Sequence, residues 1–143
     1  MLAFIAMIVT AQFHSHSSAV RMARSLPLRE RLIARILSPR YICVTLAADG
    51  VVFDWMADDL LVYRAEQACR FRPGTPRIIE VEREVLIEPA WWRAPYRLFW
   101  RNCSHFAATM LGYPWVAGMT PDLLACILAA EVRRHARENS AHP

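Results

Sequence analysis

The strongest constraint on the fold is a β-hairpin near the middle of the chain. Tyr41 to Ala47 (YICVTLA) is rich in apolar and β-branched residues, Ala48-Asp49-Gly50 is a turn, and Val51 to Met56 (VVFDWM) resembles the first run. An Asp-Gly turn between two such runs favours antiparallel pairing. The chain is therefore expected to contain an antiparallel sheet.

Two further segments have the composition of strands. Met1 to Ala11 (MLAFIAMIVTA) is apolar, lacks a positively charged start and is too short to span a bilayer. We interpret it as a first strand, buried on both faces and ending near Gln12-Phe13, and we expect no transmembrane segment. Arg77 to Ile87 alternates apolar and polar residues, which predicts a half-exposed strand. Asp58 to Gln67 fits a short strand or a helix.

The segment before the hairpin predicts a polar turn and two helices. The turn covers 14–18, and its last serines can cap a first helix that Pro27 interrupts. Ser25 can cap a second helix, which has Pro27 in its first turn and ends at Ser38-Pro39. One face of this second helix carries Leu28, Leu32, Ile33 and Ile36.

Two more helices are predicted after the last strand. Asn102 to Leu111 begins at a capping asparagine and is closed by Gly112. Thr120-Pro121-Asp122 opens the other, which runs to about Arg137 and leaves a polar tail, 138–143. The residues of this helix expected to face inward are Leu123, Leu124, Ile127, Leu128 and Val132.

Composition narrows the function. With 143 residues, of which 55% are hydrophobic, the chain is one globular domain, 1–137, with apolar surface to spare for partners. The net charge is +4, but the basic residues, all arginines, are scattered, which argues against nucleic-acid binding. No CxxC pair occurs, so we expect neither a structural zinc ion nor another cofactor, and the sequence leaves the disulfide state open. The four cysteines are Cys43, Cys69, Cys103 and Cys126.

Cys103 is the candidate nucleophile. It lies in the first turn of a predicted helix, where backbone N–H groups and the helix dipole favour an anion and lower the pKa of a thiol. Asn102 can cap this helix, and Phe106 and Ala107 are expected to face the core. A buried cysteine that only fills space is the alternative.

The run Asn102-Cys103-Ser104-His105-Phe106, placed after a β-hairpin, resembles the circularly permuted branch of the papain-like cysteine hydrolases, the NlpC-type and lecithin:retinol acyltransferase-like families. The order of elements over 1–112 is similar to that of phage-borne, tail-associated members. The resemblance implies an α+β papain-like fold, with a small antiparallel sheet packed against the cysteine helix and flanking helices.

The resemblance also implies a catalytic histidine on the first hairpin strand, where this chain has Cys43. Asp54, on the paired strand, is expected roughly opposite Cys43, at the position that orients the imidazole. The general base would therefore be missing. Three replacements stay open: His14 or His16 from the end of the first strand, His105, which on a helix points to a different face from Cys103, or a disulfide or reactive pair of Cys43 with Cys103.

Two functions follow from the resemblance. The first is a structural protein of a phage or prophage tail tip or baseplate whose hydrolase site is degraded. It would contact other tail proteins and be located in the virion, or in the bacterial cytoplasm during assembly. The alternative is an active cysteine peptidase or amidase that binds peptidoglycan and cleaves its stem peptides through Cys103. A lipid acyltransferase would need a membrane-facing segment, which the sequence does not reveal.

Overall fold

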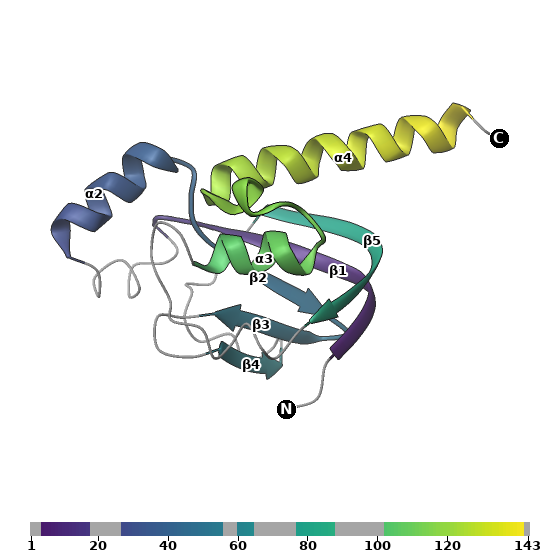
Figure 1. The fold of residues 1–143 in the computed structure, drawn as a ribbon, viewed down its shortest axis with the longest axis horizontal. Coiled ribbons are helices and arrows are strands. Elements are labelled where there is room, and N and C mark those ends of the chain that lie inside the picture. The colour runs from purple at the N-terminus through teal and green to yellow at the C-terminus, as the bar shows by residue number, and fades with distance from the viewer. Residues whose placement is uncertain (1–3, 18–26, 56–59, 65–76, 88–101, 142–143) are drawn as a thin grey trace.

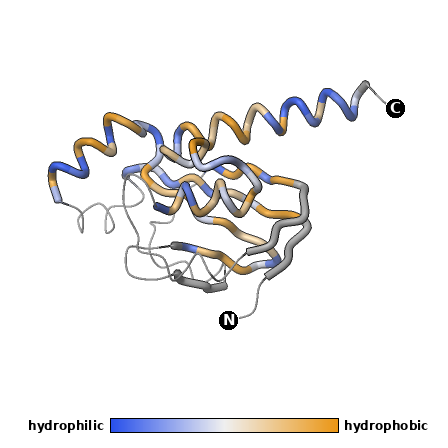
Figure 2. The backbone as a smooth tube through the Cα atoms, in the orientation of Figure 1, coloured by the Kyte–Doolittle hydropathy of each residue, from blue (hydrophilic) through white to orange (hydrophobic). Residues whose placement is uncertain are grey.

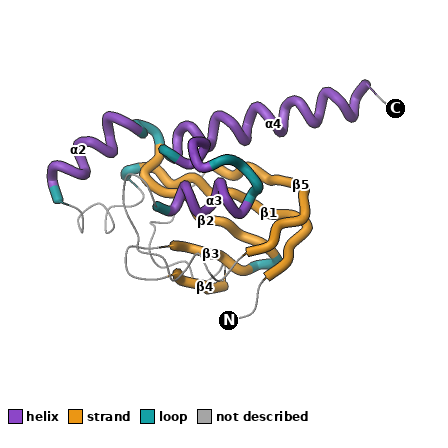
Figure 3. Tube along the Cα trace, in the orientation of Figure 1, coloured by secondary structure: helices purple, strands orange, loops and turns teal. Residues whose placement is uncertain are grey.

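The described part of the chain is an antiparallel sheet with helices packed on one face (Figure 1; Figure 3). It is a computed structural model that describes residues 4–17, 27–55, 60–64, 77–87 and 102–141. The α+β class expected from the sequence is confirmed. The elements in chain order are β1 (Phe4–Ser15), α2 (Leu28–Leu37), β2 (Tyr41–Ala48), β3 (Val51–Trp55), β4 (Leu60–Arg64), β5 (Arg77–Ile87), α3 (Cys103–Met110), the 3-10 helix η3 (Trp115–Gly118) and α4 (Pro121–Ala141).

The sheet has five strands in the order β4-β3-β2-β1-β5, and every neighbouring pair is antiparallel. The predicted hairpin is β2 and β3. Its two turn residues both have positive φ, 53° at Asp49 and 76° at Gly50, as a two-residue turn between twisted strands requires. The ambiguous segment 58–67 contains a strand, β4. β1 lies in the interior of the sheet because β5 returns to pair with its other edge.

One face of the sheet carries the hydrophobic core. Residues paired directly across antiparallel strands share a face, so Ala11 with Leu46 and Phe13 with Val44 point the same way. All four are at most 1% exposed. They belong to the same apolar cluster as buried residues of α3 and α4, which cover this face (Figure 1). The helix residues buried there include Phe106, Ala107, Leu111, Leu124 and Leu128.

The opposite face carries polar side chains, and we call it the polar face. It includes Gln12 paired with Thr45, and His14 paired with Cys43. Asp54 shares it, because it lies two residues beyond Val52, whose partner Ala47 alternates with Thr45. His14, Cys43, Thr45 and Asp54 are buried, whereas Gln12 is half-buried.

β1 differs from its prediction in two ways. It continues to Ser15, so His14 belongs to the strand and not to a turn, because the ladder with β2 extends past Phe13 to a register shift after His14. The expectation that this strand is buried on both faces is wrong. Ile8, on the polar face, is 51% exposed, since helices cover only the other face there.

α2 stands to one side of the sheet and buries none of its residues (Figure 1). Pro27 is its N-cap residue and not part of its first turn, and that cap makes no side-chain hydrogen bond. Figure 2 shows apolar and polar residues alternating along this helix. The apolar side chains left more than half exposed are Leu28, Leu32, Ile36 and Leu37.

α4 is longer than predicted and buries a narrower stripe. It continues to Ala141 through most of the segment expected as a tail, because no Gly or Pro interrupts 122–142 and Arg134 pairs with Glu138 one turn on. Figure 2 shows its second half as mostly hydrophilic. Leu123 and Val132, predicted to face inward, are 41% and 42% exposed. The stripe that packs on the sheet is instead Leu124, Ala125, Leu128 and Ala129.

Two predictions lie outside the described residues: the first helix after the 14–18 turn, with the Ser25 cap, and the end of the hairpin at Met56. No helix in the described segments is long and apolar enough to cross a membrane.

Candidate functional site

The site is built around the N-terminus of α3, which begins as predicted after Asn102. The Asn102 side-chain oxygen accepts hydrogen bonds from the backbone N–H groups of Ser104 (3.0 Å) and His105 (3.2 Å). In return, Nδ1 of His105 accepts from the backbone N–H of Asn102 at 3.2 Å. This is a reciprocal capping box. The N–H groups that could stabilise an anion at this helix end are therefore engaged in the cap.

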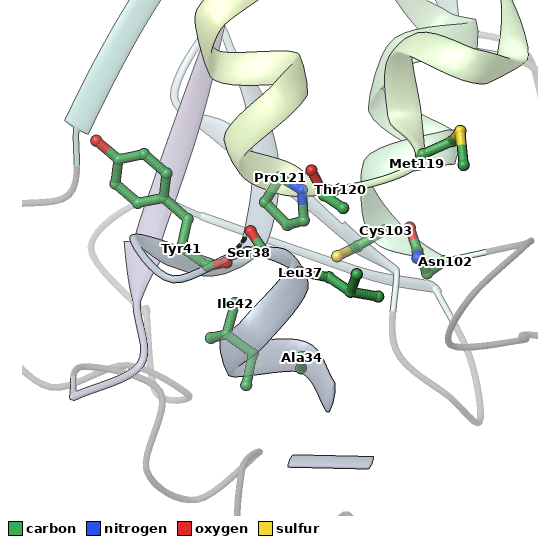
Figure 4. A pocket seen from close by; sticks show the side chains of 10 residues that line it. All are labelled: Ala34, Leu37, Ser38, Tyr41, Ile42, Asn102, Cys103, Met119, Thr120 and Pro121. Carbon is green, nitrogen blue, oxygen red and sulfur yellow. Dashed lines mark hydrogen bonds between the residues drawn. The ribbon is translucent and has the colours of Figure 1, made fainter. Parts of the chain in front are cut away.

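Cys103 is the first residue of α3 and is 3% exposed. Its side chain lines a small pocket between the end of α2, the start of β2 and the start of α4 (Figure 4). Figure 4 shows its sulfur pointing toward the space between Leu37 and Pro121. The space for the centres of water molecules amounts to about 40 Å³. The described residues that line the pocket are Ala34, Leu37, Ser38, Tyr41, Ile42, Asn102, Cys103, Met119, Thr120 and Pro121.

The chemistry of this pocket is mostly apolar. Among the described lining residues, none carries an imidazole or a carboxylate, and the polar groups come from Ser38, Asn102, Thr120 and Tyr41. The helix dipole still favours a thiolate at Cys103, but burial in apolar surroundings acts against it. The pocket can therefore shelter a thiol and a few waters, and it holds no evident general base in its described wall.

His105 is drawn away from Cys103, as its position two residues along the helix predicts. It is fully buried, and its ring stacks on Trp115 of η3 with centroids 4.2 Å apart. Burial lowers its pKa from 6.5 to about 4. Because Nδ1 accepts a hydrogen bond, the neutral ring carries its proton on Nε2, which has no hydrogen-bond partner among the described residues. His105 is a neutral structural residue of the cap.

His14 lies on the polar face, directly across from Cys43. Its Nε2 is 3.0 Å from the Thr45 hydroxyl, which in turn donates to the Gln12 side chain at 3.3 Å. Replacing Cys43 by the histidine of the family would place two imidazoles side by side. The structure thus puts a histidine one strand away from the position where the resemblance requires it.

Asp54 is fully buried on the same face. The register Leu46 with Phe53, extended by one residue, places Thr45 across from Asp54, so Asp54 is diagonal to Cys43 and not opposite to it. Cys43 and Cys103 both carry thiols, so the disulfide alternative is wrong for this structure.

His16 follows the end of β1 and reaches the α2–β2 connection. Its Nε2 is 2.7 Å from the backbone oxygen of Ser38, so this nitrogen is the donor. Ser38 itself lines the Cys103 pocket. His16 therefore fixes the wall of the pocket through the backbone and uses one ring nitrogen to do so.

Asp122 is a residue of the site that sequence reasoning assigned only to helix capping. Its carboxylate accepts from the backbone N–H of Arg40 (2.9 Å) and Tyr41 (2.8 Å), and the Ser38 hydroxyl lies 3.0 Å away. The Ser38 oxygen accepts from the Asp122 backbone N–H at 3.1 Å. These bonds hold the start of α4 against the start of β2 and so form the pocket. The Thr-Pro-Asp signature indicated the helix start, but nothing local indicated a partner 84 residues away.

Gly118 closes the other side of the cap. A Cβ atom there would lie 2.6 Å from both the Cα of His105 and the backbone oxygen of Ser104. The backbone oxygen of Gly118 also lies 2.5 Å from the Ser104 hydroxyl, which is 2.7 Å from the Asn102 side-chain oxygen. The single hydroxyl proton can serve only one of these two acceptors at a time. η3 therefore packs backbone to backbone against α3.

Comparison with protein-family models, with curated proteins and with solved structures finds no match for this chain. Among the described residues, no group of three or more His, Cys, Asp or Glu side chains is placed to hold a metal ion.

Proposed function

We propose that the chain is a papain-like, NlpC-type domain that serves as a structural protein of a phage or prophage tail tip or baseplate, with a cysteine hydrolase site that has degraded. The observation that carries the loss of activity is the enclosure of Cys103. A thiol that is 3% exposed, beside space for only a few waters, offers no path for a peptide bond to reach the sulfur.

The surroundings of the site support the same conclusion. His105 has a pKa lowered to about 4 by burial and uses its Nδ1 in the helix cap. Nε2 of His16 donates to a backbone oxygen. Cys43 stands where the resemblance requires the base. The residues that would have run the chemistry now hold the fold together.

The exposed apolar surface supports a role in an assembly. Besides the four exposed residues of α2, η3 and the start of α4 expose Trp115, Val116, Met119 and Leu123 by 41% or more. Apolar side chains in this number are typical of a surface that is buried against partner proteins. Other tail proteins are the partners that the resemblance suggests.

Thiol alkylation tests the closed site without a substrate. Cys126 is exposed and serves as the internal reference for Cys103. Iodoacetamide at pH 7, with peptide mapping by mass spectrometry, should modify Cys126 far faster than Cys103, and both at similar rates in denaturant. Preferential modification of Cys103 in the folded protein below pH 7 would contradict the proposal.

The alternative is an active cell-wall peptidase or amidase. One observation favours it: His14 lies beside Cys43, on the strand next to the position of the missing base. In this mechanism His14 would take the Cys103 proton, the thiolate would form an acyl-enzyme with a stem peptide, and water would release it. It requires the pocket to open.

Zymography on purified peptidoglycan separates the two functions. The structural proposal expects no clearing by the wild type, or clearing equal to that of Cys103→Ala. Clearing by the wild type that is lost in both Cys103→Ala and His14→Gln would establish the alternative. Mass spectrometry of purified particles from the phage or lysogen that carries the coding sequence tests the virion assignment, which fails if the chain is absent from the particles.

A further inference from the structure

A second, cationic pocket lies on the other side of the α2–β2 connection from Cys103. The described residues that line it are Ser15, His16, Ser17, Arg35, Pro39 and Arg40, and the space for water centres is about 370 Å³. It is open to solvent and several times larger than the Cys103 pocket. Two guanidinium groups, an imidazole and two hydroxyls thus converge on one hollow.

The positive charge of this pocket is not compensated within the described chain. Neither Arg35 nor Arg40 forms an ion pair with a described residue, and none of the described lining residues is acidic. The nearest carboxylate through bonding is Asp122, which accepts the backbone N–H of Arg40 and is engaged with Ser38 and Tyr41 as well. Two like charges at one hollow repel each other, and an anion between them relieves that repulsion.

The frame of the pocket is fixed before any ligand arrives. His16 holds the Ser38 backbone oxygen at 2.7 Å, and Asp122 holds the backbone of Arg40 at 2.9 Å. The hydroxyls of Ser15 and Ser17 are 3.0 Å apart, so one donates to the other. The proton of the accepting hydroxyl is then directed elsewhere, in reach of a ligand. Such a set of donors around an open hollow suits a tetrahedral oxyanion.

From these observations we infer that this pocket binds a phosphate group, with Arg35 and Arg40 as its charged ligands and the Ser17 hydroxyl as a further donor. Arginine presents paired N–H donors that match two phosphate oxygens. The phosphate can belong to a soluble phosphate monoester or to a lipid headgroup. The inference does not depend on the activity of Cys103, because the two pockets are lined by different residues.

Inorganic phosphate is the first probe, titrated at constant ionic strength with chloride as the replaced anion. Binding is followed by calorimetry and by the amide signals of the protein. Saturable shifts confined to 15–17 and 35–40 are expected. Arg35→Gln and Arg40→Gln should each weaken binding by about 10-fold, the effect of losing one charge-assisted hydrogen bond. Arg133→Gln, an exposed arginine on α4, is the matched control and should leave the affinity unchanged.

The second arm identifies the source of the phosphate. Vesicles of phosphatidylcholine with added phosphatidate are compared with pure phosphatidylcholine. Binding only to the phosphatidate vesicles, lost in Arg35→Gln/Arg40→Gln and kept in Arg133→Gln, assigns a lipid headgroup; phosphate binding without vesicle binding assigns a soluble ligand. The inference is overturned if neither probe binds, or if the double variant binds as well as the wild type while circular dichroism shows both to be folded.

Discussion

The burial of His105 makes the stability of the protein depend on pH in a defined window. In the folded chain its pKa is about 4, lowered from 6.5 by burial, and its Nδ1 must stay unprotonated to accept from Asn102. In the unfolded chain the imidazole has its ordinary pKa of about 6.5. The unfolded state therefore binds the proton more strongly between these values, and stability is lost as the pH falls through them.

The size of the loss follows from the two pKa values. Each unit of difference corresponds to about 1.4 kcal/mol, so the full effect is about 3 kcal/mol, of which about 2 kcal/mol is lost between pH 7 and pH 5. Above pH 7 the contribution of His105 is constant. For a domain of this size, whose total stability is on the order of 5–15 kcal/mol, such a loss is large.

His105→Gln is the matched variant, because glutamine at the third position of a capping box can accept from the same backbone N–H and does not titrate. Urea unfolding of both proteins at several pH values between 4 and 8, followed by circular dichroism, gives two stability curves. Their difference isolates His105, since every other titrating group is common to both. The wild type should lose stability relative to the variant below about pH 6.5. A difference curve that stays flat from pH 8 to pH 4 would refute the burial argument.

Three substitutions test other contacts. Gly118→Ala should destabilise the fold by about 1–3 kcal/mol in urea unfolding, because its methyl group would meet the backbone of α3 at 2.6 Å; no loss would mean that η3 does not pack as described. Asp122→Ala should cost about 1.5–3 kcal/mol and Asp122→Asn less, since asparagine keeps one acceptor oxygen; equal thermal stability of all three proteins would exclude the clamp on Ser38 and Tyr41. Thr45→Val, which is nearly isosteric, should cost about 1–3 kcal/mol by removing the hydroxyl that bonds His14, and it fails as a prediction if the variant is as stable as the wild type.

Local signals explain what the sequence predicted well. The Asp49-Gly50 turn needs two positive φ values, which few residue pairs accept, so the hairpin was specified within a few residues. The alternation over Arg77–Ile87 reproduces β5, and the cap at Asn102 marks the first residue of α3. Each of these depends on neighbours in sequence.

Tertiary pairing explains what the sequence could not reveal. The placement of His14 across from Cys43 depends on the β1–β2 register and on a shift after His14, neither of which has a local signature. The closing of the Cys103 pocket depends on Asp122 reaching Ser38. Helix periodicity also overestimated burial at Leu123 and Val132, because it defines a face without saying how much of it a curved sheet can cover.

The position of β1 between β2 and β5 has a consequence for how the chain reaches its fold during synthesis. β2 can pair with β1 early, but Phe13 meets Arg77 and Phe4 meets Ile87, so the second edge of β1 waits for the ribosome to deliver β5. Until then an apolar strand has a row of unpaired N–H and C=O groups, which is a template for intermolecular association. A nascent chain arrested before residue 77 should therefore aggregate or bind holdase chaperones, whereas one that has released β5 should not.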